Sequence, residues 1–394
     1  MRDVVVAGAV RTPIGRFGGA LSALTPAQLG AAAAREALRR AGVAPAQVDD
    51  VLFGCARQAG AGPNVARQVA WRAGVPQEVP AATLNMACAS SLKAIDLAFR
   101  AVRDGDAQVV VAGGVESMSR VPYLLTGARW GYRMGDQPLV DAMYQDGFLC
   151  PLSEMMMGET AERLAEEYRV GREEQDAFAL RSQQRAGRAQ AEGRFDAEIV
   201  PVRVPTKKGE EEEMRRDEHL RPETTAAMLA KLAPVFKAEG GTVTAGNSSG
   251  ITDGAAAMVV MTAERAAELG VKPMARVVGL ASAGVDPRVM GIGVVPAVRR
   301  LLEKCSLRLQ DFELVELNEA FAAQVIACDR ELRFDPERLN VNGGAIALGH
   351  PIGATGARLV VSLLHEMGRR RARRGLATLC VSGGMGMAAA FEAA

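Results

Sequence analysis

The sequence predicts an α/β fold built from two similar halves, in which mostly parallel sheets are covered by helices. Short apolar runs that suit buried strands alternate with amphipathic helices along the chain. The two ends of the chain repeat one order of motifs, which indicates an internal duplication of a single α/β unit. A polar segment at about 119–247 has no counterpart in the second half. We therefore expect a loop domain inserted into an N-terminal half, 1–270, and a C-terminal half, 271–394.

The opening elements of the two halves correspond in order. The stretch "DVVVAGAVRTPIG" near residue 3 resembles "ARVVGLASAGVDP" near residue 275. Next, "LRRAGVAPAQVDDVLFGCA" (38–56) resembles "LLEKCSLRLQDFELVELNEA" (301–320). Each of these predicts a helix end, a turn with an aspartate and a buried strand.

A cysteine marks the next element of the first half. In "NMACASSLKAIDLAF", apolar residues at near-helical spacing over 92–102 predict a helix, and Ser90 and Ser91 are residues that favour a helix start. Cys88 is therefore expected at, or just before, a helix N-terminus. The strand "VVVAGGVE" (109–116) follows.

The matching elements of the second half carry a histidine and another cysteine. They are "NGGAIALGHPIGATG" (342–356), a helix to Met367 and "TLCVSGGMG" (378–386). In the first half, "GNSSGITDGAAAMVVM" (246–261) is expected to return the chain from the loop domain to the sheet. The charge run "KKGEEEEMRRDEH" (207–219) is expected to be a solvated loop. The basic run at 369–374 is expected to complement a helix C-terminus rather than to bind phosphate.

Composition excludes several classes of function. A net charge of +1 gives no general attraction to nucleic acid or to an anionic membrane. The first apolar run, Val4 to Val10, is too short for a secretory signal, and no stretch is long enough to span a bilayer. The six cysteines form no C-x-x-C pair, so we expect free thiols in a reducing, cytoplasmic compartment. None of the three histidines has metal-ligand spacing, so no metal site is expected.

Four residues suggest nucleophilic chemistry without proving it singly. Backbone N–H groups and the dipole at a helix start lower a thiol pKa and can hold an oxyanion, which favours Cys88 as a nucleophile over a core cysteine. His350 lies in a loop of small residues that opens a helix, and this position suits either a base or a residue that caps the helix. Cys380 lies at the end of a strand, and this position suits either an acid/base or a buried cysteine of the core. Asn318 lies where a strand becomes a helix, where an N-cap role is sufficient.

Taken together, these motifs resemble the thiolase family (acetyl-CoA acyltransferases) along essentially the whole chain. The motifs are "NMACASS", "GGVESMS", "GNSSGITDGAAA", "NEAFA", "GHPIGATGAR" and "CVSGGMG". The resemblance implies the thiolase fold, with two βαβ-rich halves in a five-layer α-β-α-β-α arrangement, and a homodimer or homotetramer. It implies thiolytic cleavage of 3-ketoacyl-CoA, while the net charge of +1 predicts no nucleic-acid partner. A hydratase/dehydrogenase partner is left open.

The resemblance also implies a role for each site residue. Cys88 is the nucleophile that carries the acyl group, His350 takes its proton, and Cys380 is the second acid/base. Asn318 holds a water that forms one oxyanion hole with His350. The backbone N–H groups of Cys88 and Ser382 form the other.

Coenzyme A is implied as a co-substrate, with no tightly bound cofactor. By resemblance, Arg221 matches the residue near the adenine and phosphate end, and Ser249 matches the one that bonds the pantetheine. Met157 and Phe321 match residues that line the acyl pocket.

Two departures from the family pattern bear on function. Many biosynthetic, acetoacetyl-specific thiolases carry His where Met156 stands, which favours the degradative β-oxidation type of fatty acid metabolism. Ser382 replaces a glycine, which is harmless if the turn needs no positive φ there. Three alternatives stay open: a biosynthetic acetoacetyl-CoA thiolase, a β-ketoacyl synthase-like enzyme and a non-catalytic acyl or lipid carrier.

Overall fold

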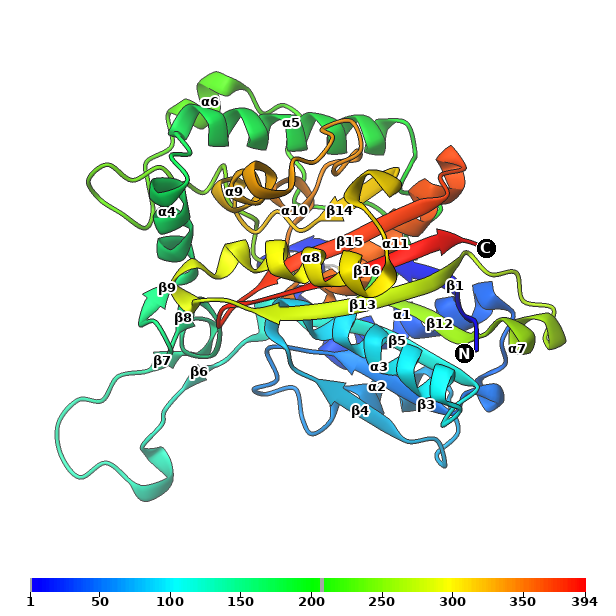
Figure 1. Cartoon of the computed structure of the whole chain (residues 1–394). Coiled ribbons are helices and arrows are strands. Elements are labelled where there is room, and N and C mark those ends of the chain that lie inside the picture. Colours follow the sequence, from blue (N-terminus) through cyan, green and yellow to red (C-terminus); the bar gives the residue numbers. More distant parts are fainter. Residues whose placement is uncertain (1, 206–208) are drawn as a thin grey trace.

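The computed structural model describes residues 2–205 and 209–394. Its largest sheet has ten strands, and the two halves of this sheet repeat one pattern of strand pairing (Figure 1). In each half a parallel pair is followed by two antiparallel pairs. The N-terminal half runs β4 (Ala81–Leu84), β3 (Asp50–Gly54), β5 (Val109–Ser117), β12 (Thr252–Thr262) and β1 (Val4–Arg11), with β2 (Gly15–Arg16) beside β12. The C-terminal half runs β14 (Leu314–Leu317), β15 (Arg374–Val381), β16 (Met385–Ala393) and β13 (Ala275–Gly284), and β13 pairs with β1.

The repeated pairing confirms the predicted two similar halves, but the prediction of mostly parallel sheets is wrong. Only β3–β4, β3–β5 and β14–β15 are parallel among the described strands. The tight turn at 382–384 forces β16 to run back along β15, and β12 returns antiparallel to β5 from the loop domain. The strands are apolar on both sides because helices cover both faces of the sheet, whatever the strand direction.

Helices and sheet form the five layers that the resemblance implied. Apolar side chains of the outer helices pack on each half of the sheet, and a central pair of helices fills the space between the halves. The outer helices are α1 (Pro26–Ala41) and α2 (Val65–Ala73) on the N-terminal half, and α8 (Val294–Cys305) and α9 (Ala322–Leu332) on the C-terminal half. The central pair is α3 (Ser90–Asp104) and α11 (Ile352–Arg370). The short α7 (Ala263–Glu268) follows β12.

The helix predicted after Cys88 is confirmed, although its start differs in detail. The apolar positions at 92, 95, 99 and 102 are all buried, and α3 ends at Asp104, where it is capped by Gly105 with a φ of 93°. Ser90 and Ser91 do not cap the helix, because the N-cap is Ala89, which has no side-chain bond to offer. The Ser91 hydroxyl instead accepts the Ala357 N–H at 2.9 Å, which ties α3 to α11.

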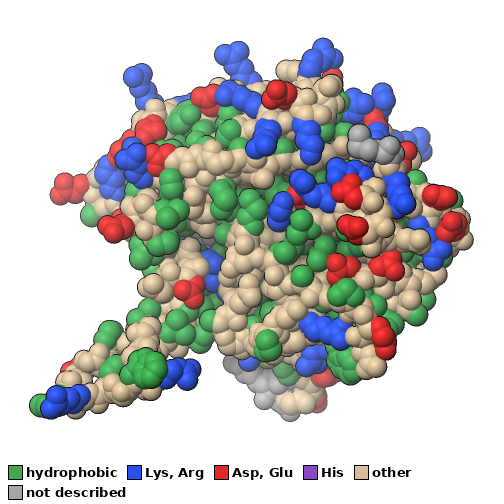
Figure 2. Space-filling model, turned by 60° about the horizontal axis from the view of Figure 1, so that its bottom comes forward, with side chains coloured by type: hydrophobic (Ala, Val, Ile, Leu, Met, Phe, Trp, Pro, Cys, Tyr) green, Lys and Arg blue, Asp and Glu red, His purple; other side chains and the backbone are tan. Residues whose placement is uncertain are grey.

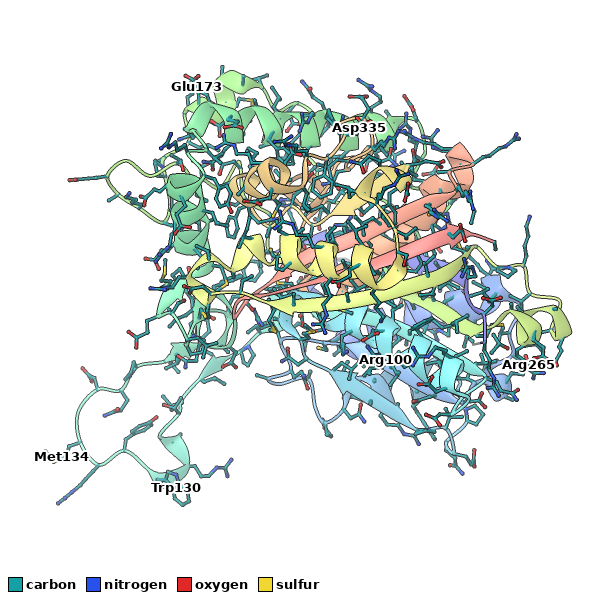
Figure 3. The ribbon with its side chains drawn as sticks, in the orientation of Figure 1. Arg100, Trp130, Met134, Glu173, Arg265 and Asp335 are labelled. Carbon is teal, nitrogen blue, oxygen red and sulfur yellow. The ribbon has the colours of Figure 1, made fainter. Side chains whose placement is uncertain are left out.

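The inserted segment forms a small domain beside the C-terminal half, with α4 and α5 against α9 (Figure 1). Its helices are α4 (Met157–Glu167), α5 (Arg172–Ala191) and α6 (Ala226–Ala230). Its hairpins are β6/β7 (Tyr123–Leu124, Val140–Asp141), β8/β9 (Leu149–Cys150, Met155–Met156) and β10/β11 (Val202–Pro205, Glu211–Met214). An arm between β6 and β7 projects from the body with apolar side chains on its surface (Figure 2). Trp130 and Met134 at its tip are 88% and 85% exposed (Figure 3).

The two charge runs have different outcomes. Residues 207 and 208 of the acidic run lie outside the described residues, and 211–214 form the exposed strand β11. The expectation of a solvated loop is wrong for Asp217, which is buried and accepts two bonds from the equally buried Arg11 guanidinium at 2.7 and 2.9 Å. The basic run follows α11 as expected, and the last turn of the helix contains two of its arginines. In the described part of the chain, no helix is both long and apolar enough to cross a membrane.

Candidate active site

A cavity of about 570 Å³ opens where the two halves meet the loop domain, and it collects the residues predicted for the site. Eight of the nine line it: Cys88, Met157, Arg221, Ser249, Phe321, His350, Cys380 and Ser382. The ninth, Asn318, is fully buried behind the wall, with its Nδ2 3.5 Å from His350 Nε2. Residues that are hundreds of positions apart in the chain therefore converge on one space.

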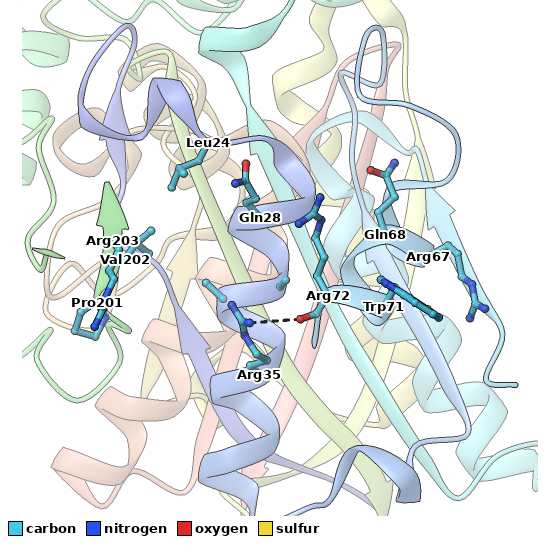
Figure 4. Close-up of a pocket in the computed structure, with 12 residues that line it drawn as sticks. Leu24, Gln28, Arg35, Arg67, Gln68, Trp71, Arg72, Pro201, Val202 and Arg203 are labelled. Atoms are coloured by element: carbon cyan, nitrogen blue, oxygen red, sulfur yellow. Dashed lines mark hydrogen bonds between the residues drawn. The ribbon is translucent and has the colours of Figure 1, made fainter. Parts of the chain in front are cut away.

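A larger hollow of about 950 Å³ lies elsewhere, between α1, α2 and β10 (Figure 4). Arginines and the exposed Trp71 line it, and Arg35 donates to the Arg72 carbonyl at 3.4 Å. Its lining includes no cysteine and no histidine. The smaller cavity is therefore the one equipped for nucleophilic chemistry.

Cys88 lies in a 3-10 turn, Ala87–Ala89, directly before α3, as the sequence predicted. Ala87 has a φ of 45°, a left-handed conformation that costs energy for a residue with a side chain. The Asn85 side chain supports this turn, because its Oδ1 accepts the Ala87 N–H at 3.0 Å. The strained turn presents the thiol to the cavity at the head of the helix.

The predicted lowering of the Cys88 pKa is wrong for the resting protein. Burial, which disfavours the thiolate, raises the pKa of Cys88. The backbone N–H of Ser382, the Arg57 guanidinium and the N–H of Cys88 itself act in the opposite direction without overcoming burial. Cys88 is thus a neutral thiol at rest, so a reaction of its sulfur as a nucleophile would need a base.

His350 is held as a neutral imidazole with a fixed orientation. Its Nδ1 lies 2.6 Å from Thr355 Oγ1, and that hydroxyl donates to the Pro351 carbonyl at 3.0 Å. Since the hydroxyl proton is already used, Thr355 accepts from Nδ1–H, which leaves Nε2 as the unprotonated nitrogen. Burial, with help from the positive charges of Arg358 and Arg57, lowers the pKa of His350 to about 3. The ring is therefore unprotonated at neutral pH.

Small residues around His350 serve close packing within the protein. The His350 N–H donates to the Gly250 carbonyl at 3.0 Å. Gly349 has a φ of 103°, and a Cβ there would lie 2.3 Å from Thr252. A Cβ at Gly353 would lie 2.7 Å from the Val115 carbonyl oxygen. These glycines let the start of α11 sit directly against the sheet, which fixes the imidazole.

Cys380 and Ser382 approach the cavity from the end of β15 and the turn that follows. Burial raises the pKa of Cys380 well above its ordinary value, and the nearby Cys88 sulfur adds to the effect. Ser382 is not among the residues with positive φ, whereas Gly383 and Gly384 have φ values of 85° and 80°. The replacement of a glycine by Ser382 therefore does not strain the turn.

The residues expected to contact coenzyme A lie at different depths. Arg221 lines the cavity and is exposed to solvent. The Ser249 N–H donates to the Ala320 carbonyl at 2.9 Å, which fixes that loop against the start of α9. Met157 and Phe321 are both buried, and the Phe321 ring packs edge-on against Phe236 at 6.2 Å. The wall there is apolar and also includes Met156.

Sequence reasoning missed three residues at this site. Thr355 orients His350, and its hydroxyl five positions after the histidine, in the first turn of a helix, was a usable signal. Arg57 and Met290 line the cavity, but the sequence around them gave no sign of it. The first belongs to a connection after β3 and the second to a 3-10 segment before α8.

Comparison with known proteins gives one consistent picture. The family model "Thiolase, N-terminal domain" matches residues 4–264, and "Thiolase, C-terminal domain" matches residues 271–393. The chain is 53% identical over 398 residues to an acetyl-CoA acetyltransferase of Syntrophomonas wolfei, covering 100% of this chain and 99% of the relative. It is 51% identical over 392 residues to one of Cupriavidus necator, covering 100% of both.

Solved structures agree with the sequence relatives. The crystal structure of the Bacillus anthracis acetyl-CoA acetyltransferase matches with a TM-score of 0.97 at 47% identity, covering 100% of this chain and 99% of that one. Human mitochondrial 3-ketoacyl-CoA thiolase matches with a TM-score of 0.96 at 41% identity, with the same coverage.

Proposed function

Because the chain belongs to the thiolase family and is an acyltransferase, we propose that it cleaves 3-ketoacyl-CoA with CoA through an acyl group on Cys88. The products are acetyl-CoA and an acyl-CoA shortened by two carbons, and the reverse reaction is a Claisen condensation. One observation carries the proposal: Cys88, Cys380 and His350 line a single cavity, and His350 keeps its basic nitrogen unprotonated.

In the first half-reaction, His350 Nε2 takes the proton of the Cys88 thiol as the sulfur attacks the ketone carbon. The backbone N–H groups of Cys88 and Ser382 act on the Cys88 sulfur, which supports a role for them near the reacting acyl group. A water held by Asn318 and His350 would stabilise the enolate oxygen. The C2–C3 bond breaks, its electrons form the enolate of acetyl-CoA, and the Cys380 thiol protonates C2.

In the second half-reaction, the Cys380 thiolate takes the proton of the incoming CoA thiol. The CoA sulfur attacks the acyl group on Cys88, and the tetrahedral adduct collapses. Cys88 leaves as a thiolate and recovers its proton from His350. Burial raises the pKa of both thiols, so each is a strong base once deprotonated, which suits proton exchange with carbon and sulfur acids.

Coenzyme A is proposed as a co-substrate, with no tightly bound cofactor. Arg221 would meet the adenine and phosphate end, since it is the exposed cation among the site residues. Ser249 would bond the pantetheine, and Met157 and Phe321 would contact the acyl end. The apolar character of this inner wall supports an acyl pocket there.

We further propose the degradative, β-oxidation type, on the ground that Met156 offers no hydrogen bond to a short substrate and adapts to varied apolar neighbours. The second candidate is the biosynthetic acetoacetyl-CoA type, which the names of the curated relatives favour.

The working form is proposed to be a cytoplasmic homodimer or homotetramer. The apolar side chains exposed on the arm at 125–139 support self-association. A hydratase/dehydrogenase partner would supply the 3-ketoacyl-CoA.

A thiolysis assay tests the proposed function. Purified protein is mixed with CoA and a series of 3-ketoacyl-CoA substrates of four to twelve carbons, and acetyl-CoA is measured as a product. We expect acetyl-CoA and the matching shortened acyl-CoA in equal amounts, with no product from Cys88→Ser. Turnover that persists in Cys88→Ser would contradict the proposal.

A further inference from the structure

Arg57 places an unpaired positive charge in the wall of the active cavity. It lines the same cavity as Cys88, and the residue is only 7% exposed. Its Nε is buried with no hydrogen-bond partner. Within residues 2–205 and 209–394, no carboxylate lies at ion-pair distance from this guanidinium. Buried arginines in proteins are normally paired, so this one calls for a partner that the chain itself does not provide.

The nearest acidic group is already committed elsewhere. The Glu116 carboxylate accepts the backbone N–H groups of Ala56 and Arg57, each at 3.0 Å, and that of Gly353 at 2.8 Å. The Cys55 thiol also points to it at 3.5 Å. Glu116 therefore fixes the backbone of Arg57. Its charge interacts with the guanidinium at longer range, but no hydrogen bond or ion pair joins the two side chains, so the donors of the guanidinium are left to the cavity.

A glycine on the opposite side determines where the guanidinium lies. A Cβ at Gly147 would stand 2.3 Å from Arg57 Nη2 and 2.6 Å from its Cζ. Gly147 is buried in the turn Tyr144–Phe148, whose two terminal rings pack edge-on at 5.8 Å and also line the cavity. The guanidinium thus packs directly against the backbone of this turn, in space that a side chain at position 147 would fill.

The position of Arg57 separates it from the proposed coenzyme A site. Arg221, the cation proposed for the phosphate end, is exposed. Arg57 is buried, and its positive charge favours the thiolate form of Cys88. The acyl chain of the substrate is the part that remains on Cys88 after C2–C3 cleavage. An anion near Arg57 would therefore come from the acyl chain rather than from CoA.

On the basis of the proposed function, we propose that Arg57 binds a carboxylate at the far end of the acyl chain. The substrates would be short 3-ketoacyl-CoAs whose chain ends in a carboxylate. The bond changes are those of ordinary thiolysis: the C2–C3 bond breaks, acetyl-CoA leaves, and a CoA monothioester of a dicarboxylic acid is released. The terminal carboxylate is unchanged throughout. A bidentate guanidinium–carboxylate contact is the geometry that arginine suits best.

A matched pair of six-carbon substrates tests this assignment. One is the 3-ketoacyl-CoA with a carboxylate at C6, and the other has a methyl group there. The measured quantity is the ratio of their kcat/KM values in thiolysis. We expect the ratio to favour the carboxylate in the unmodified enzyme and to fall about 10- to 100-fold in Arg57→Gln, the range for loss of a hydrogen bond to a charged group.

Two further variants show whether a change in the ratio comes from the Arg57 charge or from a general defect in folding. Gly147→Ala retains the charge but displaces it, so it should lower the same ratio. Arg72→Gln removes an exposed charge from α2, outside this cavity, and should leave the ratio unchanged.

Three results would overturn the assignment. The first is equal use of both six-carbon substrates by the unmodified enzyme, which leaves the thiolase activity itself intact. The second is an equal loss on both substrates in Arg57→Gln, which would make Arg57 a positioning residue for Cys88. The third is cleavage of neither substrate, nor of any other 3-ketoacyl-CoA, which would remove the proposed function as well.

Discussion

Replacing Thr355 by valine tests how the base at this site is prepared. Valine has nearly the shape of threonine but cannot accept the proton on His350 Nδ1, a contact of 2.6 Å in the structure. The Nδ1–H group would then be buried without a partner, at a cost of about 1–3 kcal/mol. The imidazole avoids that cost by turning or by moving its proton to Nε2. In either case the nitrogen proposed to accept the Cys88 proton is lost.

The size of the effect follows from that cost. A penalty of about 1–3 kcal/mol corresponds to about 5- to 150-fold in rate. Complete loss of a general base would cost about 10²- to 10⁴-fold, which sets the upper limit. We therefore expect kcat/KM for thiolysis to fall about 10- to 100-fold in Thr355→Val.

Thr355→Ser is the matched control, because it keeps the hydroxyl and should stay within about threefold of the unmodified enzyme. The assay is steady-state thiolysis, with thermal unfolding measured on each variant to exclude loss of fold. A Thr355→Val enzyme that is folded and works at the normal rate would refute the argument that this hydroxyl sets the tautomer of His350.

Three other outcomes are expected. Cys380→Ser should still transfer an acyl group to Cys88 but slow carbon–carbon cleavage about 10²- to 10⁴-fold; normal turnover would exclude its acid/base role. Over a substrate series, kcat/KM should rise from four carbons to medium chains, because each methylene buried beside Met156 adds about 0.8 kcal/mol, or roughly fourfold in affinity; a steep fall at six carbons would mean a closed pocket. The third outcome concerns acid stability. The pKa of His350 is lowered to about 3 in the folded chain from an ordinary 6.5, so between pH 6.5 and about pH 3 the unfolded chain takes up this proton and the folded chain does not. The free energy of unfolding should fall by up to about 1.4 kcal/mol per pH unit between pH 6 and pH 4. His350→Gln should flatten that part of the profile, and an unchanged profile would argue against a buried neutral histidine.

The repeat in the sequence was enough to predict the two similar halves, since β1 and β13, or β3 and β14, begin from matching motifs. Strand direction was not predictable in the same way. A strand buried on both faces looks alike whether its neighbours run parallel or antiparallel, and the turn at 382–384 that reverses β16 is short enough to be read as part of one motif.

The site residues that lie within strong motifs were predictable, because Cys88, His350 and Cys380 each lie beside a distinctive run of small residues. The raised pKa of Cys88 was not predictable, because an argument from the helix start counts the nearby N–H groups but not the loss of water around the buried sulfur. Arg57 was missed for a related reason. Its importance depends on having no partner, and that is a property of the folded cavity rather than of the chain.

The central claim is that Cys88 carries the acyl group, and mass spectrometry tests it most directly. The protein is incubated with acetyl-CoA, digested, and each of its six cysteines is examined for an acetyl adduct. Cys150 is a demanding internal comparison. Burial raises its pKa, but the backbone N–H groups of Leu152, Ser153 and Gly383 act in the opposite direction and its pKa is lowered, while the pKa of Cys88 is raised. The account predicts acetylation at Cys88, lost in Cys88→Ser and retained in Cys380→Ser. Stable acylation of Cys150 or another cysteine, with Cys88 unmodified, would contradict it.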